Sequence, residues 1–192
     1  EDECVALALN EQYMPRFALD ALPASDLGQA MSLADRLDVL VGTFALGQKP
    51  TGVKDPFKLR RHALAVVRLL IEIPVAMNLS TLIEEARATY GNSLVDVGET
   101  LAELKPFILE RMQSFYQGQG IAADLVRAVR ARQDDCLYDF NQRLNALVAF
   151  TRLPEAQALS AACKRVNNIL QHVSSDTLLS KSVDESLLLE PA

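Results

Sequence analysis

Basic side chains are concentrated in one stretch of this chain. Between residues 49 and 68 the only acidic residue is Asp55, and there are six basic ones: Lys49, Lys54, Lys58, Arg60, Arg61 and Arg68. The stretch therefore has a net charge of +5 in a chain whose net charge is −6, which leaves −11 for the remainder. Lysine and arginine attract nucleic-acid phosphate in a salt-sensitive way. The stretch is a candidate nucleic-acid surface, and its candidate binding side chains are Lys49, Lys54, Lys58 and Arg61.

The backbone predicted around these lysines also suits phosphate. Glycine and proline residues indicate a turn-rich loop over residues 47–54. Asp55 followed by Pro56 predicts that a helix begins there, with a capping carboxylate and a proline in the first helical position. The free N–H groups at the start of a helix favour anions. The alternative is that the stretch is a basic face in contact with water only, and the sequence leaves both interpretations open.

Arg60 differs from its basic neighbours in its predicted environment. At about 100° per residue, it falls among apolar residues such as Val67 and Ile71 rather than on the polar side of its helix. A charged group in apolar surroundings needs a partner. The preceding predicted helix carries Asp35 and Asp38. We expect Arg60 to pair with one of these carboxylates and so to lock the two helices around the loop.

A second, smaller polar patch lies further along the chain. Lys164 and Arg165 are followed by Asn167 and Asn168 at the end of an alanine-rich predicted helix. These side chains either contact RNA or simply face solvent. We keep Lys164 and Arg165 as candidate RNA-binding residues.

Residue types that carry catalysis or bind metals are sparse. His62 and His172 are isolated from each other in the sequence, so no metal cluster is predicted, and we expect His62 on the solvent side of its helix. The three cysteines, Cys4, Cys136 and Cys163, form no CxxC pair and are expected to be reduced thiols, as is usual in the cytosol. We therefore predict neither a catalytic residue nor a metal site in this chain.

Composition indicates an all-α protein. Hydrophobic residues make up 49 % of the chain but aromatic residues only 6 %, because leucine and alanine dominate. A sequence pI near 5.0 argues against a generic nucleic-acid-binding domain, although it leaves room for a local basic surface. No apolar run approaches the roughly 20 residues of a membrane span. The opening residues Glu1, Asp2 and Glu3 do not form a signal peptide or include an initiator methionine, so we expect a fragment of a longer protein.

Helical spacing and helix-breaking residues predict the elements of this fold. Leu33, Leu37, Leu40 and Phe44 recur at the spacing of one buried helix face. Pro106 predicts a kink in its helix, or two separate helices. No stretch shows the alternation of apolar and polar residues that is typical of a β-strand. The predicted helices cover residues 3–12, 26–46, 55–73, 80–90, 94–117, 121–132, 134–151 and 154–172.

Three segments, which follow one another in order, carry a resemblance to a known family. They are ALNEQYMPRF (8–17), LADRLDVLVGTFALGQKPTGVKDPFKLRRHALAVVRLL (33–70) and AACKRVNNIL (161–170). In sequence and spacing they resemble the beta subunit of the bacterial two-subunit glycyl-tRNA synthetase, and the middle segment is long and specific. The resemblance implies a multi-helix HD-like domain over residues 1–133, followed by the incomplete beginning of a helical anticodon-binding domain over residues 134–192.

The resemblance also implies a function. The family's enzyme uses ATP to attach glycine to tRNA-Gly and works as a cytoplasmic α2β2 assembly. Its alpha subunit holds the glycine and ATP sites, including the Mg²⁺ that ATP needs, while the beta subunit contributes tRNA recognition. The implied partners of this chain are tRNA-Gly and the alpha subunit, with no membrane. The chain alone is expected to be inactive and to hold no cofactor.

Two other functions are compatible with the same residues. Residues 33–38, LADRLD, resemble the last element of an HD-type metal site, which would make Asp35 a ligand. The histidine elements of such a site would lie upstream of this sequence, so a degenerate phosphohydrolase module is one alternative. A helical spacer that docks the alpha subunit is the other.

Overall fold

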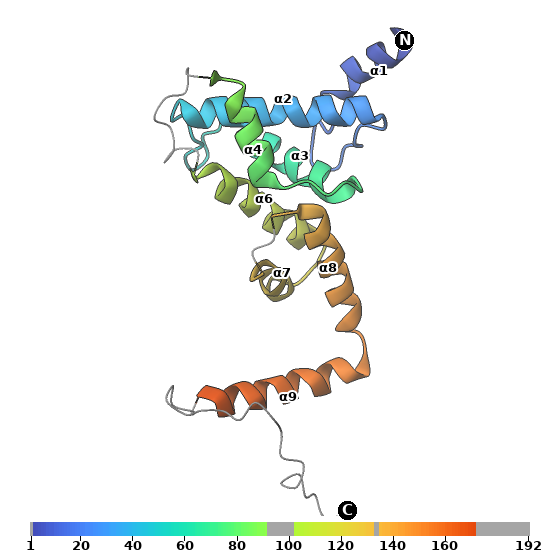
Figure 1. Cartoon of the computed structure of the whole chain (residues 1–192), viewed down its shortest axis with the longest axis vertical. Helices are drawn as coiled ribbons and strands as arrows, with labels where there is room; N and C mark the ends of the chain where they lie inside the picture. The colour runs from blue at the N-terminus through green and yellow to red at the C-terminus, as the bar shows by residue number, and fades with distance from the viewer. Residues whose placement is uncertain (1, 92–101, 133–134, 172–192) are drawn as a thin grey trace, which may run out of the picture. The chain divides into compact units, whose positions relative to one another are not determined.

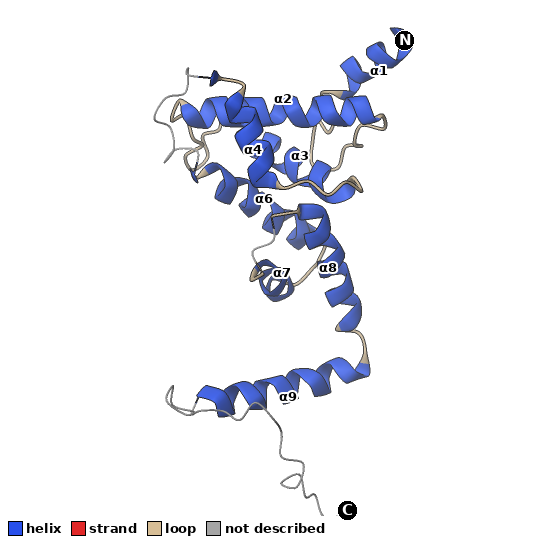
Figure 2. Cartoon of the chain, in the orientation of Figure 1, coloured by secondary structure: helices blue, strands red, loops and turns tan. Residues whose placement is uncertain are grey.

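The computed structural model describes residues 2–91, 102–132 and 135–171. In these ranges the chain forms eight helices and no strand, which confirms the predicted all-α class (Figure 2). The helices are α1 (Asp2–Glu11), α2 (Asp26–Ala45), α3 (Leu59–Glu72), α4 (Leu79–Ala88), α6 (Leu104–Gly118), α7 (Ala123–Arg130), α8 (Leu137–Phe150) and α9 (Pro154–Gln171). The chain divides into two compact units, residues 1–148 and 149–192.

Helix α2 is the central support of the first unit, and α3, α4 and α6 lie along one side of it (Figure 1). The predicted apolar stripe of α2 is buried, since Leu33, Leu37, Leu40 and Phe44 are all less than 8 % exposed. Ser25 caps the helix, because its Oγ accepts a hydrogen bond from the Gly28 N–H at 3.0 Å. Burial of this stripe against the neighbouring helices is the main stabilising contribution of α2.

Helix α3 begins later than the sequence predicts. Asp55 does cap it, with Oδ1 accepting from the Leu59 N–H at 2.8 Å and Oδ2 from the Arg60 N–H at 3.0 Å. Lys58 precedes the helix in the left-handed region, with φ at 57°, so the chain turns once more before it becomes helical. Pro56 therefore lies outside the helix, and the predicted start at Asp55 and Pro56 was wrong. The Asp55 carboxylate also occupies two N–H groups that the sequence analysis had left for phosphate.

Pro106 lies at the start of a helix rather than in the middle of one, because the chain turns at Glu103, between the helical residue Ala102 and α6. It is the third residue of α6, within the first turn, where a backbone N–H has no helical partner and proline is tolerated. Most of the predicted helix before it, residues 94–101, lies outside the described residues. For α6 itself, the structure thus shows one helix that starts close to its proline.

The first compact unit extends to residue 148 because α8 packs into its core. Tyr116 of α6 is 1 % exposed, and its hydroxyl donates a hydrogen bond to Asn141 Oδ1 at 3.0 Å. Its ring also lies 5.8 Å from that of Phe140, between centroids, and Leu144 is fully buried nearby in the same core. The compact units divide between residues 148 and 149, and the predicted domain boundary at 133/134 stays a prediction, because this division identifies neither domain. The assignment of an HD-like and an anticodon-binding domain stays a prediction.

Two buried charged residues hold the loop between α1 and α2 in place. Glu11 is 4 % exposed, and its carboxylate accepts hydrogen bonds from the Ala24 N–H and from the N–H and hydroxyl of Ser25. The hydroxyl bond is the largest cause that lowers the pKa of Glu11. Arg68 of α3 donates to the carbonyl oxygens of residues 18 and 20 at 3.1 and 2.7 Å, and its Nε pairs with Glu72 at 2.8 Å. Hydrogen bonds from these two charged side chains thus fix the backbone of this loop.

The second unit contains one described helix, α9, most of whose side chains are exposed. Lys164 and Arg165 lie on it, and apolar residues such as Val166 and Ile169 are more than half exposed. None of the helices described here has both the length and the apolar character that crossing a membrane requires.

Candidate nucleic-acid interface

A basic pocket lies between the turn at residues 13–16, helix α2 and the start of α3. Its volume is about 370 Å³. Eight residues line it: Tyr13, Pro15, Arg16, Asp35, Arg36, Lys58, Arg61 and His62. Four of the eight are lysine or arginine and one is acidic, so the pocket has the charge that phosphate requires. We call this set of residues the basic pocket.

Arg36 belongs to the framework of the basic pocket. It is 5 % exposed, and its Nη2 donates to the Tyr13 and Pro15 carbonyl oxygens at 2.9 and 3.1 Å. Its Nη1 donates to the Gln12 carbonyl at 2.8 Å and to the Ser32 hydroxyl at 2.9 Å. Burial lowers the pKa of the guanidinium, while the charge of Asp35 opposes that shift. Arg36 thus fixes the turn that forms one wall, and its hydrogen-bonding capacity is used within the protein.

Lys58 and Arg61 are the exposed cations of the basic pocket. Because Lys58 is left-handed and directly precedes α3, it lies one turn before Arg61, whose N–H donates to the Lys58 carbonyl at 2.9 Å. Neither side chain forms an ion pair with any residue that the structure describes. Two exposed cations on one turn are available to an external anion.

His62 lies between the exposed rim and the buried framework of the pocket. It was predicted on the solvent side of its helix, but it is half-buried, and its Nδ1 is buried without a hydrogen-bond partner in the described part of the chain. Burial lowers its pKa, the charge of Arg36 adds to the shift, and Asp35 opposes it. His62 is therefore neutral near pH 7 and would gain a proton more readily with an anion beside it.

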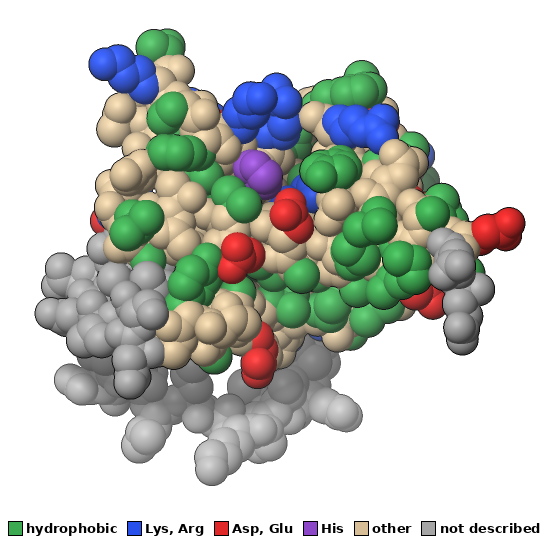
Figure 3. All heavy atoms as spheres, turned by 90° about the horizontal axis from the view of Figure 1, so that it is seen from above, with side chains coloured by type: hydrophobic (Ala, Val, Ile, Leu, Met, Phe, Trp, Pro, Cys, Tyr) green, Lys and Arg blue, Asp and Glu red, His purple; other side chains and the backbone are tan. Residues whose placement is uncertain are grey.

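Charge is divided at the surface of the molecule. Figure 3 shows Lys and Arg side chains along one edge of the face and Asp and Glu side chains away from that edge. Asp35 is exposed and lines the basic pocket, so it lies at the border between the two regions. The segregation of charge along the sequence is thus also a segregation in space.

The remaining predicted cations of the loop do not line the pocket. Lys49 Nζ pairs with Glu103 Oε2 at 2.7 Å. Lys54 is exposed in a tight turn, where its N–H donates to the Thr51 carbonyl at 2.8 Å. The structure thus brings together Lys58 and Arg61 of the predicted set, whereas Lys49 has an internal partner. A role in RNA binding stays a prediction for each of them, as it does for Lys164 and Arg165 on α9.

The predicted ion pair of Arg60 does not form. The Nη2 atom of Arg60 donates to the Gly52 carbonyl at 2.5 Å, and the residue is half-exposed. Asp35 and Asp38 are both exposed, and no ion pair joins either of them to Arg60 among the described residues. The delayed start of α3 explains the difference, because Arg60 is now in the first turn and reaches back over the loop. Arg60 closes the loop 52–60 instead of joining two helices.

The most constrained arginine of the site, Arg36, was not among the residues predicted from the sequence. Arg36 falls between Leu33 and Leu37 on the buried stripe of α2, where the argument applied to Arg60 would have required a partner. That signal was present in the sequence. No signal in the sequence indicated that Arg16 and Tyr13 line the pocket, since their position depends on how the turn at 13–16 folds back onto α2.

Asp35 is also the residue that the HD-type resemblance proposed as a metal ligand. Within the described ranges no group of three or more histidine, cysteine, aspartate or glutamate side chains is arranged to hold a metal ion. Asp35 instead has the half-buried His62 and the buried Arg36 as its neighbours in the pocket. This arrangement places an acid beside a basic pocket.

Comparison with known proteins agrees with the resemblance seen in the sequence. The family model described as "Glycyl-tRNA synthetase beta subunit" matches residues 1–131. The chain is 46 % identical over 192 residues to the glycine–tRNA ligase beta subunit of Alteromonas mediterranea, and 45 % identical over 191 residues to that of Escherichia coli. These matches cover 100 % of this chain but 28 % and 27 % of the two relatives, so the chain spans just over a quarter of their length. The chain belongs to the glycyl-tRNA synthetase beta subunit family.

Proposed function

We propose that this chain is a tRNA-binding, non-catalytic part of a glycine–tRNA ligase beta subunit. The observation that carries the proposal is the pair of exposed cations Lys58 and Arg61, which form no ion pair within the described part of the chain, beside the half-buried His62. An RNA phosphate at the basic pocket would contact both cations. It would also offer an acceptor to the His62 ring once that ring is protonated.

The geometry favours a backbone contact over recognition of a base. Cations on a helix turn attract phosphate irrespective of sequence, and such contacts fix the register of a nucleic acid rather than read it. The framework of Arg36 and the turn at 13–16 holds the pocket in shape before RNA arrives. We infer that this part of the protein positions tRNA-Gly, while other parts select it.

In the complete enzyme, the chain would work with an alpha subunit that carries the chemistry. The proposed reaction is the ATP-dependent attachment of glycine to tRNA-Gly by a cytoplasmic α2β2 assembly. ATP, its Mg²⁺ and glycine would bind to the alpha subunit, and this chain alone would show no aminoacylation. The family membership supports this proposal, and the printed names of the relatives, glycine–tRNA ligase beta subunit, support it as well.

The direct test is charge reversal at the two free cations. Lys58→Glu combined with Arg61→Glu should weaken binding of labelled tRNA-Gly to the chain by about ten- to hundredfold near 0.1 M salt, because each reversal removes one phosphate contact and adds a repulsion. The slope of log affinity against log salt should fall by about 2. The same substitutions in the assembled ligase should lower aminoacylation at limiting tRNA.

A matched control is available in the same compact unit. Arg127 and Arg130 are exposed on α7, so Arg127→Glu combined with Arg130→Glu changes the net charge equally without touching the basic pocket. This control should change tRNA affinity by less than about threefold, as expected for a long-range effect screened at 0.1 M salt. If the two pairs weaken binding equally, the basic pocket is not the RNA site.

A structural spacer remains the second candidate for one part of the stretch. Lys49 is paired with Glu103, and Arg60 is bonded to the Gly52 carbonyl, so both cations serve the internal structure of the loop. If the chain is a structural spacer, every cation of the basic stretch serves the internal structure of the loop. Charge reversal at Lys58 and Arg61 would then leave tRNA binding unchanged. The experiment above therefore separates the two functions.

A further inference from the structure

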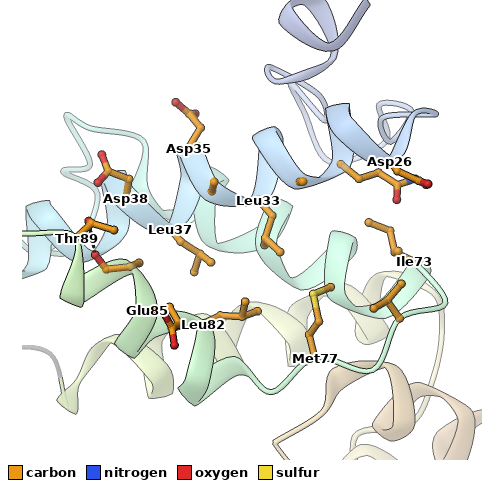
Figure 4. Close-up of a pocket in the computed structure, with 15 residues that line it drawn as sticks. Asp26, Leu33, Asp35, Leu37, Asp38, Ile73, Met77, Leu82, Glu85 and Thr89 are labelled. Carbon is orange, nitrogen blue, oxygen red and sulfur yellow. Dashed lines mark hydrogen bonds between the residues drawn. The ribbon is translucent and has the colours of Figure 1, made fainter. Parts of the chain in front are cut away.

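A large groove lies between α2 and the segment that runs from the end of α3 through α4. Its volume is about 880 Å³, more than twice that of the basic pocket. Figure 4 shows the apolar side chains of Leu33, Leu37, Met77 and Leu82 pointing into the space between these elements. This acidic groove, as we call it, belongs wholly to the first compact unit and shares only Asp35 with the basic pocket.

The floor of the acidic groove is apolar. Leu33, Leu37 and Ile73 form it and are themselves at most 7 % exposed. Met77 and Leu82 are half-buried beside them, which leaves part of each side chain open to a ligand. Ala30 and Ala34, exposed on α2, leave room for another helix to approach closely. A floor of this kind favours an apolar ligand surface.

The rim of the acidic groove carries charge of one sign. Four exposed carboxylates line it, those of Asp26, Asp35, Asp38 and Glu85. Among the described residues that line it, none is lysine, arginine or histidine. Asp26 and Asp38 lie at opposite ends of the α2 edge in Figure 4, about 18 Å apart along the helix axis at 1.5 Å per residue. An apolar floor with an acidic rim of this length is complementary to a helix with an apolar stripe and basic flanks.

We propose that the acidic groove docks an amphipathic helix of a partner protein, with lysines or arginines flanking an apolar stripe of about three turns. RNA is excluded as the occupant, because four carboxylates would repel its phosphates. An acidic or neutral helix would bury the same apolar area but would leave the rim carboxylates without partners. The proposal is independent of the RNA site, so either can fail without the other.

The test uses two designed peptides that differ only in the charge of their flanks. Both are 14-residue helices with leucine at positions spaced for one face, and one has lysine flanks whereas the other has glutamate flanks. Fluorescence anisotropy with the whole chain should show at least tenfold tighter binding of the lysine peptide at low salt. The difference should shrink as salt is raised, because the carboxylates of the rim are exposed to solvent.

Charge reversal on the rim should remove this preference. Asp38→Lys combined with Glu85→Lys leaves two carboxylates and two lysines on the rim, so the glutamate peptide should bind more tightly than it does to the native chain, a gain that an unfolded or damaged chain cannot produce. Asp124→Lys combined with Glu155→Lys is the matched control, since both residues are exposed and lie outside the groove. This control should keep the preference for the lysine peptide.

Methionine methyl resonances locate the bound peptide. Met77 is the one methionine that lines the groove among the described residues, whereas Met112 is 1 % exposed in the core. The lysine peptide should shift the Met77 methyl signal and leave that of Met112 in place. The proposal is overturned if both peptides bind equally, if neither binds, or if Met77 is unaffected. It is also overturned if sedimentation shows that a second copy of the chain, rather than a separate helix, fills the groove.

Discussion

The basic pocket and the acidic groove meet at one residue and differ in almost everything else. Asp35 lines both. The pocket is small, rigidly framed by Arg36 and rimmed by Lys58 and Arg61, whereas the groove is larger, apolar and rimmed by carboxylates. One helix, α2, contributes residues to each. The difference shows how a chain with net charge −6 can still offer phosphate a favourable surface, because its charges are separated across one helix.

The largest expected effect concerns the framework of the basic pocket. Arg36→Ala would leave the carbonyl oxygens of Gln12, Tyr13 and Pro15 without their donor in a buried position. We expect the free energy of unfolding to fall by about 3 kcal/mol, the range for loss of several charge-assisted hydrogen bonds. Urea denaturation of the whole chain measures it. A loss below about 1 kcal/mol would mean that Arg36 does not hold the turn.

That framework also marks the limit of prediction from sequence. The helices were predictable because leucine and alanine recur at helical spacing, and the predicted apolar stripe of α2 is buried. The start of α3 was not predictable from Asp55 and Pro56, because the choice between a helix and a further turn depends on the left-handed Lys58.

The site was predictable in its chemistry but only partly in its members. Lys58 and Arg61 were identified by charge density, and the structure places both at one pocket. Lys49 looked equivalent to them in the sequence, and Arg60 was predicted to pair with Asp35 or Asp38, yet Glu103 and the Gly52 carbonyl are the partners of these two residues. Such partners come from the packing of distant segments and from the exact helix start, neither of which local sequence specifies.

The next prediction uses the residue that the two regions share. Asp35→Lys should strengthen tRNA binding at the basic pocket and weaken binding of the lysine-flanked peptide at the acidic groove. Each affinity should change by about fivefold, because one charge at close range in a solvent-exposed site contributes about 1 kcal/mol. Figure 4 shows Asp35 pointing away from the groove floor, so the change should leave the apolar contacts intact.

Asp35→Asn should give effects of the same signs but smaller size, and anisotropy titrations with both ligands measure them. If both ligands respond in the same direction, the charge of Asp35 does not divide the two regions.

A smaller effect is expected from pH. Burial lowers the pKa of His62 in the free chain, and a bound phosphate would raise it, so tRNA affinity should increase by about two- to threefold as the pH falls from 7.5 to 6. His62→Gln should flatten this dependence while Lys58 and Arg61 keep most of the affinity. Titrations with tRNA at several pH values test it, and an unchanged slope in His62→Gln would place the phosphate elsewhere.

His62 should also make the stability of the chain depend on pH, in the direction opposite to that of tRNA affinity. Because the folded chain holds the pKa of His62 below its usual value near 6.5, the unfolded chain takes up the proton more readily. Its contribution to stability is therefore complete above about pH 6.5 and declines as the pH falls toward the folded-state pKa. Urea midpoints of the native chain and of His62→Gln should converge at low pH. Parallel midpoints across this window would show that the pKa of His62 is not lowered.

The smallest expected effect is at Lys49. Because Lys49 is paired with Glu103, Lys49→Gln should change tRNA affinity by less than about twofold, within the range of an exposed ion pair. Lys58→Gln, at a cation without an internal partner, should reduce it more. A larger loss at Lys49 than at Lys58 would move the RNA site from the basic pocket to the loop.

The most direct measurement is a lysine footprint of the chain with and without saturating tRNA-Gly. Lys58 lines the basic pocket, whereas Lys105, in the same compact unit, is paired with Asp135 at 2.6 Å. If RNA phosphate occupies the pocket, tRNA should slow acetylation of Lys58 several-fold and leave Lys105 unchanged. Equal reactivity of Lys58 in both samples, or stronger protection of Lys105, would contradict the assignment of the basic pocket as the RNA site.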